Sequence, residues 1–397
     1  MVSKILLTDF FRSGTILGEE FGMPSRCSEI EFEWGDLNEL MLKASRIRDA
    51  YWGRTVTYSR KVFVPLTNMC RDTCKYCTFV KHPNSPEAKI LSPEEVLRIA
   101  RQGQDNGCKE LLFSLGEKPE QRYEQARKAL KALGYEKMTH YLRDMCSMVL
   151  RETTLLPHVN AGTLSSDEID LLRPVSASMG MMLETISRRL TKQGQAHFAC
   201  PDKVPIQRLR TLRRAGEKSV PFTTGLLIGI GESFEERVEA LHAINASHQE
   251  FGHIQEVIIQ NFQRKPDIEM ANHPEPTLKD MLRTIAVARI ILDPSISLQA
   301  PPNLSDRHMN YLQAGINDWG GISPVTIDFI NPQHAWPQIA ILAKSTASAG
   351  FLLQERLTVY PAFQRQSQTF MNEKMAKSVL GMARADGLAL DQELKAS

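Results

Sequence analysis

The stretch "KVFVPLTNMCRDTCKYCTF", residues 61–79, joins an apolar run to three closely spaced cysteines. Residues 61–67 are mostly Val, Phe and Leu, a composition typical of a buried β-strand. Cys70, Cys74 and Cys77 follow at once, so they are expected on the loop after that strand. If the strand is the first of a (β/α) barrel, this loop lies at the carboxyl-terminal mouth, where such folds carry out their chemistry.

Short apolar runs recur at fairly even intervals and predict eight strands. They cover residues 61–67, 110–115, 154–160, 176–183, 220–228, 254–262 and 295–300, with a weak eighth run near Trp319. Amphipathic segments with the signals of helix ends lie between these runs. Ser92, Ser165 and Ser233 are each followed three residues later by Glu, the pattern of a capping box. Gly107 and Gly216 are interpreted as helix stops.

This alternation predicts parallel strands joined by crossover helices, and therefore an α/β fold of the TIM-like (β/α) barrel type, complete or partly open. A doubly wound sheet is the alternative, although no Gly-rich dinucleotide-binding turn follows the first run. We divide the chain into an N-terminal extension, residues 1–60, the barrel, residues 61–340, and a C-terminal helical extension, residues 341–397. The first extension is expected to hold a helix near residues 36–50.

The composition is that of an ordinary globular protein, with 42% hydrophobic and 24% charged residues and a net charge of +2. Lys and Arg are scattered, which argues against a nucleic-acid partner. The smoothest apolar stretch, residues 223–231, is about half the length that a membrane span requires. The apolar run among the first residues is too short for the core of a signal peptide. We therefore expect a cytoplasmic protein.

Seven cysteines, an odd number, favour metal binding or catalysis over a disulfide framework. Cys27, Cys108, Cys146 and Cys200 are dispersed along the sequence, and we interpret them as buried, inert thiols.

The three clustered cysteines admit two metal centres. A structural zinc ion normally takes four protein ligands, often as two pairs, and His82 is the one further candidate close in sequence. A [4Fe-4S] cluster has four irons, so three thiolates leave one iron open to a small molecule. Catalytic metal sites keep a coordination position open, whereas structural sites fill every position with protein ligands. An iron without a protein ligand is therefore typical of a catalytic centre. The triplet therefore favours the cluster.

The spacing CxxxCxxC, with aromatic Tyr76 before the last cysteine, resembles the radical S-adenosylmethionine (SAM) superfamily. The resemblance implies that Cys70, Cys74 and Cys77 hold one [4Fe-4S] cluster per chain and that SAM chelates its free iron. It also implies that an electron from the cluster splits SAM into methionine and a deoxyadenosyl radical, and that Tyr76 lies beside the adenine. Packing of the loop is the structural alternative for Tyr76.

The same resemblance implies further SAM contacts at the ends of the predicted strands. They are Gly116 and Glu117, Asn160, Glu184, and Gly229 with Gly231. Leu115 stands where the superfamily often has the first Gly of a Gly-Gly-Glu turn, so only Gly116 and Glu117 are carried over. For Glu184 the structural alternative is a partly buried acid paired with an arginine, such as Arg188 one turn later.

Longer stretches narrow the family. "LLPHVNAG", "SMGMMLE", "VPFTTGLLIGIGE", "GHIQEVIIQNF", "QAPPNL" and "DWGGISPVT" occur in the order found in the CofG-type family, the stand-alone half of deazaflavin (Fo) synthase. That family is a carbon-nitrogen lyase. The resemblance implies that the chain converts a tyrosine-derived 5-amino-5-(4-hydroxybenzyl)-6-(D-ribitylimino)uracil adduct to 7,8-didemethyl-8-hydroxy-5-deazariboflavin, with release of ammonia.

Such a small-molecule substrate needs polar groups at the barrel mouth, and the ends of the last three strands offer them. The candidates are Gln260, Asn261, Lys265, Gln299, Asn303, Asp318 and Trp319, the last as a flat surface for a heterocycle. Polar caps of surface loops are the alternative for each. His158 and His253 are interpreted as hydrogen-bonded scaffold, and no residue is assigned a catalytic role.

The resemblance also implies a CofH-type partner enzyme that supplies the adduct and an electron donor such as a ferredoxin or flavodoxin. Two other interpretations stay open. The chain could be the CofH-like half, which joins tyrosine to the diaminouracil, or a metal-binding module without catalytic activity.

Overall fold

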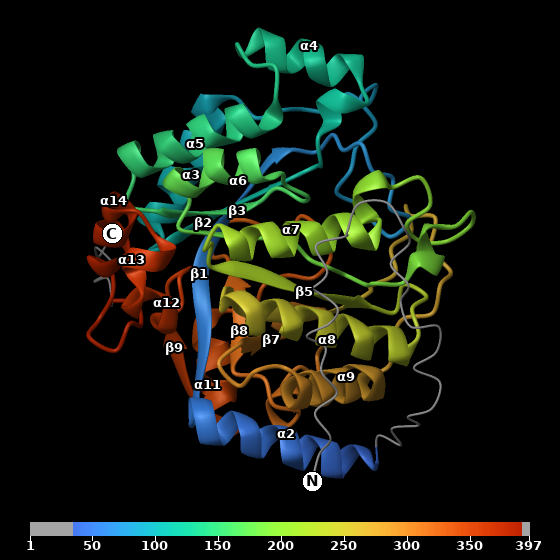
Figure 1. The fold of residues 1–397 in the computed structure, drawn as a ribbon, viewed down its shortest axis with the longest axis vertical. Coiled ribbons are helices and arrows are strands. Elements are labelled where there is room, and N and C mark those ends of the chain that lie inside the picture. The colour runs from blue at the N-terminus through green and yellow to red at the C-terminus, as the bar shows by residue number, and fades with distance from the viewer. Residues whose placement is uncertain (1–34, 391–397) are drawn as a thin grey trace.

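A computed structural model describes residues 35–390 as a closed barrel of parallel strands surrounded by helices (Figure 1). The strand order is β2-β3-β4-β5-β6-β7-β8-β1, and β1 also pairs with β2. The barrel strands are β1 (Thr55–Thr67), β2 (Glu110–Leu115), β3 (Leu156–Asn160), β4 (Ser178–Gly180), β5 (Phe222–Ile228), β6 (Ile254–Asn261), β7 (Ser297–Gln299) and β8 (Asp318–Ile322). The predicted (β/α) barrel is confirmed, and its complete closure excludes the doubly wound sheet.

Helices follow most strands and pack around the barrel. They are α2 (Leu37–Trp52), α3 (Pro93–Asp105), α4 (Glu124–Ala132), α5 (Met138–Glu152), α6 (Ser166–Leu172), α7 (Pro205–Glu217), α8 (Phe234–Phe251), α9 (Leu278–Ile291), α10 (Asn310–Gln313), α11 (Ile339–Ser348), α12 (Pro361–Arg365), α13 (Ser367–Phe370) and α14 (Glu373–Leu380). No helix among residues 35–390 has the length and apolar character needed to cross a membrane. The expectations for the first residues and for Cys27 fall outside the described residues.

The predicted capping boxes at Ser92, Ser165 and Ser233 are confirmed at the starts of α3, α6 and α8. Thr277 begins α9 in the same way, with Asp280 in place of Glu. The predicted stop at Gly216 is wrong, because α7 continues to Glu217. A Cβ at Gly216 would lie 2.5 Å from the Phe251 ring, so this glycine allows α7 and α8 to pack closely.

The first strand is longer than predicted, and its length organises the barrel. Residues 61–67 pair with β2, whereas the earlier residues 55–58 pair with a ninth strand, β9 (Leu352–Glu355). On its other side β1 pairs with β8. The C-terminal segment that we expected to be helical thus also contributes a strand to the sheet. The domain boundaries at residues 60 and 340 stay a prediction.

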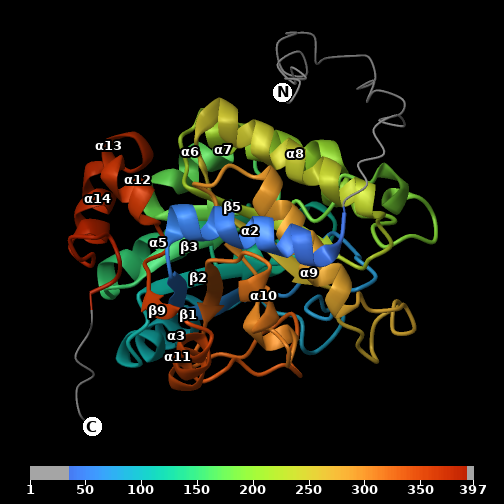
Figure 2. The ribbon, with the colours of Figure 1, turned by 90° about the horizontal axis from the view of Figure 1, so that it is seen from below.

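Two elements cover the amino-terminal end of the barrel. Helix α2 lies across it (Figures 1 and 2), and buried Arg48 donates hydrogen bonds of 2.9 Å to the carbonyl oxygens of Leu312 and Ile316. After β9 the chain passes beneath the strands, where Gln255 donates to the Thr358 carbonyl oxygen at 3.0 Å. This end of the lumen is therefore closed by protein, and the carboxyl-terminal end is the mouth.

Glycine at position 225 is required where β5 lies beside β6. The residue pairs with Ile258, and a Cβ there would overlap the Ile258 backbone. We expect Gly225→Ala to lower the free energy of unfolding by about 2 kcal/mol, because the strands must separate to admit a methyl group. Denaturant unfolding measures the loss. Gly35→Ala, at an exposed position with room for a Cβ, is the control, and equal stability of the two variants would contradict the explanation.

Candidate active site

The cysteine loop is held against the turn after β2 at the barrel mouth. The backbone N–H groups of Glu117 and Asp72 donate to Cys70 Sγ at 3.1 and 3.4 Å. The Arg71 N–H donates to the Glu117 carbonyl oxygen at 2.9 Å. A Cβ at Gly116 would overlap the Met69 carbonyl oxygen, so only glycine allows this close approach. Gly116 therefore positions the loop through its backbone, whatever ligand the site holds.

The surroundings of the thiols suit iron-sulfur ligation. Cys70 receives two N–H donors, and Cys77 receives backbone hydrogen bonds from Phe79 and Val80. Hydrogen bonds of this kind to cysteine sulfur set the reduction potential of a cluster. Burial raises the pKa of the Cys70 thiol to about 12, so a positively charged partner such as a metal centre is needed to keep it as a thiolate.

The geometry disfavours a mononuclear zinc site. Four thiolates around one zinc ion lie about 3.8 Å apart, given bonds of about 2.3 Å. Within residues 35–390, the three cysteines do not form a group whose ligand atoms all lie within 4.8 Å of one another. His82 is exposed, and its Nδ1 accepts the N–H of Asn84. The wider spacing fits a multi-iron cluster better than a single ion.

A fourth thiol lies beside the loop. Cys200 is buried and shares a hydrogen bond with Cys74, and its sulfur accepts the Thr73 N–H at 3.3 Å. Cys108 and Cys146 are also buried, as expected, but lie in the main core instead. No local pattern predicted the contact between Cys74 and Cys200, because more than a hundred residues separate them.

Glu184 lies at the centre of a buried ionic network. Its carboxylate accepts from Tyr76 Oη at 2.6 Å and from Lys203 Nζ at 2.7 Å, and Arg208 Nη2 lies 3.5 Å away. His197 Nε2 is 3.2 Å from the same carboxylate. Although burial favours the neutral acid, Lys203 and Arg208 hold the pKa of Glu184 well below its usual range. The site therefore keeps an ionised carboxylate between two cations.

The alternative considered for Glu184, a buried acid paired with an arginine, is met by Arg208 and not by Arg188, which is exposed and takes no part in this network. Glu184 has a φ angle of 64°, which a non-glycine residue seldom adopts. Its N–H donates to the Gly225 carbonyl oxygen at 2.8 Å, and its carbonyl oxygen accepts from Leu227 at 3.1 Å. This bridge to β5 holds the strained residue in place and aims its side chain at Tyr76.

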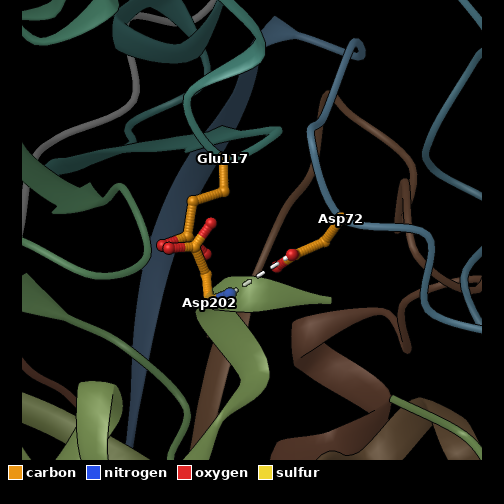
Figure 3. Close-up of side chains that lie close together, drawn as sticks. All are labelled: Asp72, Glu117 and Asp202. Carbon is orange, nitrogen blue, oxygen red and sulfur yellow. Dashed lines mark hydrogen bonds between the residues drawn. The ribbon is translucent and has the colours of Figure 1, made fainter. Parts of the chain in front are cut away.

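A second acidic group lies next to the loop. Asp72, Glu117 and Asp202 are buried with carboxylate oxygens within 4.8 Å of one another, and Figure 3 shows their side chains converging. The Asp202 N–H donates to Asp72 Oδ1 at 3.3 Å. Arg71 binds the Asp202 carboxylate through two nitrogens, and Thr163 donates to Glu117. These contacts compensate much of the charge within the protein.

Glu117 and Glu184 are linked by one cation. Arg208 lies 4.0 Å from the Glu117 carboxylate and 3.5 Å from that of Glu184. Burial raises the pKa of Glu117 to about 7, with Asp202 and Asp72 adding to the effect and Arg208 opposing it. The fold thus brings together Tyr76, Glu117 and Glu184, three of the predicted SAM contacts. Lys203, Arg208 and His197 complete this group and were not predicted.

The other predicted SAM contacts lie elsewhere around the mouth. Gly229 and Gly231 form a turn with φ angles of 89° and 110°, closed by Glu232, whose carboxylate accepts from the N–H groups of Gly229 and Ile230. A Cβ at Gly231 would lie 3.3 Å from Leu190, which packs with Tyr76 in one apolar cluster. Asn160, at the end of β3, lines the lumen.

The lumen contains a cavity of about 210 Å³ that extends from the mouth to a polar floor. Phe63 and Trp336 stack in its upper wall, with ring centres 5.3 Å apart and planes 3° from parallel. The floor is lined by charged and polar side chains from several strands and from the segment after β9. These are Lys61, Glu110, His158, Thr223, Glu256, Gln299, Arg356 and Thr358.

The predicted substrate residues are divided between the cavity and its surroundings. Gln260 lines the cavity, and Asp318 lies behind its floor, 2.6 Å from Arg356. Asn303 donates to Asp328, a residue of the cavity wall, at 3.0 Å. Asn261 is buried beside the lumen and does not line the cavity.

Trp319 belongs to the main core. Its side chain is fully buried, and its indole N–H donates to Thr346 Oγ1 at 3.2 Å. Asp318 points to the floor, so the next residue along β8 points outward, towards the helices. The aromatic surface of the cavity comes instead from Phe63 and Trp336.

The charged floor was missed, although part of its signal is visible in the sequence. Lys61 and Glu110 begin apolar strand runs and Glu256 interrupts one, and all three side chains line the cavity. A charge inside a buried strand needs a partner, which the sequence does not name. Arg356 comes from a segment far along the chain, and no local sequence pattern predicts that it reaches the floor.

One ring nitrogen of His158 is hydrogen-bonded within the protein, and the side chain also lines the cavity. Its Nδ1 lies 2.7 Å from Ser178 Oγ, and a Cβ at Gly180 would lie 2.9 Å from its Nε2. Burial lowers its pKa to about 4, although Glu110 opposes this. His253 is fully buried between the rings of Phe222 and Phe251.

The depressed pKa of His158 predicts a pH-dependent loss of stability. Below pH 6.5 an ordinary histidine in the unfolded chain gains a proton, whereas folded His158 stays neutral to about pH 4. The unfolded state then binds more protons, so stability falls as the pH falls through this window. Between pH 7.5 and 5.5 we expect His158 to account for about 1 kcal/mol of the loss.

Denaturant unfolding of His158→Gln at both pH values tests this. The variant should lose about 1 kcal/mol less than the unchanged protein. His82→Gln, at an exposed position, is the control. An identical pH dependence for His158→Gln and the unchanged protein would show that the buried imidazole does not cause the effect.

Comparison with known proteins identifies the superfamily and supports the fold. Residues 64–244 match the radical SAM superfamily. The crystal structure of HydG, a maturase of the [FeFe]-hydrogenase, is similar with a TM-score of 0.66 and 19% identity, over 87% of this chain and 73% of that one. Methylornithine synthase (PylB) is similar with a TM-score of 0.60 and 17% identity, over 80% and 89%. At these identities the two structures support the fold alone.

Relatives of higher identity narrow the family. The FO synthase of Mycobacterium tuberculosis (strain CDC 1551 / Oshkosh) is 47% identical over 374 residues, which are 90% of this chain. The chain spans only 44% of that protein's length. The 7,8-didemethyl-8-hydroxy-5-deazariboflavin synthase of Methanopyrus kandleri is 49% identical over 312 residues, covering 78% of this chain and 93% of the relative. The chain therefore belongs to the radical SAM superfamily and, within it, to the family of 7,8-didemethyl-8-hydroxy-5-deazariboflavin synthases.

Proposed function

We propose that the chain is a SAM-cleaving carbon-nitrogen lyase that converts the tyrosine-derived ribitylated uracil adduct to 7,8-didemethyl-8-hydroxy-5-deazariboflavin, with release of ammonia. The observation that carries this proposal is the cysteine loop at the mouth of a closed barrel, with N–H groups aimed at sulfur, in a chain 49% identical to a synthase of that name. The lumen beside the loop, which protein closes at its amino-terminal end, supports it, because radical chemistry requires the exclusion of water.

Cys70, Cys74 and Cys77 would hold a [4Fe-4S] cluster by three of its irons. When bound and reduced, the cluster supplies the electron that cleaves SAM to methionine and a deoxyadenosyl radical. The protein's part is to orient SAM and keep its charges compensated. Lys203 and Arg208 can face the SAM carboxylate, and the ionised Glu184 can face its amino group or ribose hydroxyls. Tyr76, held by Glu184, offers an apolar face for the adenine.

The partners in the proposal are a CofH-type enzyme that makes the adduct and a ferredoxin or flavodoxin that reduces the cluster. A cytoplasmic location stays a prediction from the composition. The cavity gives the substrate both the surfaces it needs, with stacked Phe63 and Trp336 above and polar groups below. The CofH-like activity and the metal-binding module without activity are outcomes that the experiments below distinguish.

Single replacement of Cys70, Cys74 or Cys77 by Ala should abolish cluster assembly, because each removes one of three iron ligands. Iron and sulfide analysis and the absorption near 400 nm measure the cluster, and deoxyadenosine release measures SAM cleavage. Cys108→Ala and Cys146→Ala, in the core away from the loop, are the controls and should retain both. A stable cluster in a variant of the triplet would rule out the proposed ligands. One zinc per chain and no cluster would favour the binding module.

The substrate is tested by supplying two substrate sets separately to the iron-reconstituted protein with SAM and a reductant. With the adduct we expect deoxyadenosine, ammonia and the deazaflavin product, measured by mass spectrometry. With tyrosine and the diaminouracil we expect only background deoxyadenosine. The reverse pattern would identify the CofH-like half, and no turnover with either set would contradict both enzyme assignments.

A further inference from the structure

The polar floor of the cavity is built from three buried ion pairs, two of which share Arg356. Lys61 Nζ lies 2.7 Å from Glu110 Oε1. Arg356 Nε lies 2.6 Å from Asp318 Oδ2, and Arg356 Nη2 lies 2.9 Å from Glu256 Oε1. All five side chains are at least nine-tenths buried. They come from four strands and from the segment after β9, so the floor is a constructed feature of the closed barrel.

The charges of the floor cancel within the protein. Lys61 is matched by Glu110 and Arg356 by Asp318, which leaves Glu256 as the odd carboxyl group. Burial raises the pKa of Glu256, with Arg356 opposing the effect and Asp318 adding to it. His158 is neutral at pH 7. The floor therefore has no excess positive charge with which to bind an anion.

Several polar atoms of the floor remain open to the cavity. The Lys61 ammonium has three donors, and among the described residues Glu110 is its one ion-pair partner. Within residues 35–390, no hydrogen bond is made by His158 Nε2 or by the side-chain amides of Gln299 and Gln260, all three residues lining the cavity. These groups include both donors and acceptors. They suit a ligand that carries several hydroxyl groups.

Two glycines keep these polar groups in the lumen. A Cβ at Gly321 would overlap the Lys61 side chain, and one at Gly180 would lie 2.9 Å from His158 Nε2. Lys61 and His158 therefore occupy space that a larger side chain at Gly321 or Gly180, on the neighbouring strands, would fill.

The upper cavity has the opposite character and lies next to the cysteine loop. Phe63 and Trp336 stack there, and Thr78, one residue after Cys77, donates to the carbonyl oxygen of Ile330 at 2.9 Å. Ile330 also lines the cavity. Phe63 is two residues after Lys61 on β1, a rise of about 6.6 Å. That height matches the reach of an extended five-carbon chain.

We propose that the floor formed by Lys61, Glu110, His158 and Gln299 binds the uncharged ribityl chain of the substrate and selects against its phosphorylated form. The ring system then lies above, beside Phe63 and Trp336 and towards the cysteine loop. For the identity of the substrate, this inference rests on the proposed function.

Selection against phosphate follows from the balance of charge. A phosphate brings nearly two negative charges into a buried site, and their loss of hydration must be repaid by cations. Lys61 and Arg356 already form ion pairs with carboxylates, and Glu110 and Asp318 would repel the phosphate group. Hydroxyl groups require only hydrogen bonds, which the open donors and acceptors supply.

Calorimetric binding to the cluster-loaded protein with SAM tests the proposal with three probes. These are 5-amino-6-(D-ribitylamino)uracil, its 5′-phosphate, and 5-amino-6-(methylamino)uracil, which lacks the hydroxyl chain. We expect the ribityl compound to bind at least tenfold more tightly than either of the others. Equal binding of the three, or no binding of any, would overturn the assignment of the floor.

Two variants and one control test whether Lys61 causes the preference for the ribityl probe. Lys61→Met removes the ammonium, and Gly321→Ala displaces it while keeping every charge. Both should bring the ribityl and methyl probes within about threefold of each other. Lys109→Met is the matched control, because Lys109 is equally buried and pairs with Glu355 at 2.6 Å outside the cavity. Cluster content and circular dichroism establish that each variant is folded.

The outcomes separate this inference from the proposed function. If the protein prefers the ribityl probe and loses that preference in the variants but does not convert the adduct, the floor assignment stands and the proposed reaction is wrong. If it converts the adduct but the variants retain the full preference, the reaction stands and the floor assignment is wrong.

Discussion

The pairing of β1 with strands on both of its sides is the constraint on which the rest of the structure depends. Its later half pairs with β2, and its earlier half pairs with β8 and with β9. This closes the sheet, because β1 joins β2 to β8 and no strand of the barrel is left at an open edge. It also fixes the direction of the chain, so the cysteines leave β1 at the mouth while Lys61 and Phe63 point into the lumen.

Buried charge is gathered in two networks at opposite ends of the lumen. Near the mouth, Glu184 is held by Lys203 and Arg208, and at the floor Arg356 is held by Asp318 and Glu256. Buried ion pairs contribute little net stability, because the lost hydration offsets their attraction. Their presence here is better explained by binding, since the first network faces the cysteine loop and the second faces the cavity.

The segment after β9, near the end of the described chain, contributes side chains to the floor of the cavity. Its Arg356 enters the floor, and Thr358 lies between Gln255 and the Ser178 hydroxyl. Truncation of a segment that resembles a peripheral extension would therefore remove part of the cavity. The separation of polar floor and aromatic upper wall gives a substrate with two unlike ends one preferred orientation.

The sequence by itself determined the approximate positions of the strands, three helix starts and the cysteine loop, because each depends on local signals. Apolar runs predict strands, Ser followed by Glu predicts a capped helix, and three closely spaced thiols predict a metal centre. Only the tertiary structure decided which charges meet. The partners of Glu184, the contact between Cys74 and Cys200, and the arrival of Arg356 at the floor join residues far apart in the chain. Inward and outward positions on β8 also differ by a single residue, so register placed Asp318 at the floor and Trp319 in the core.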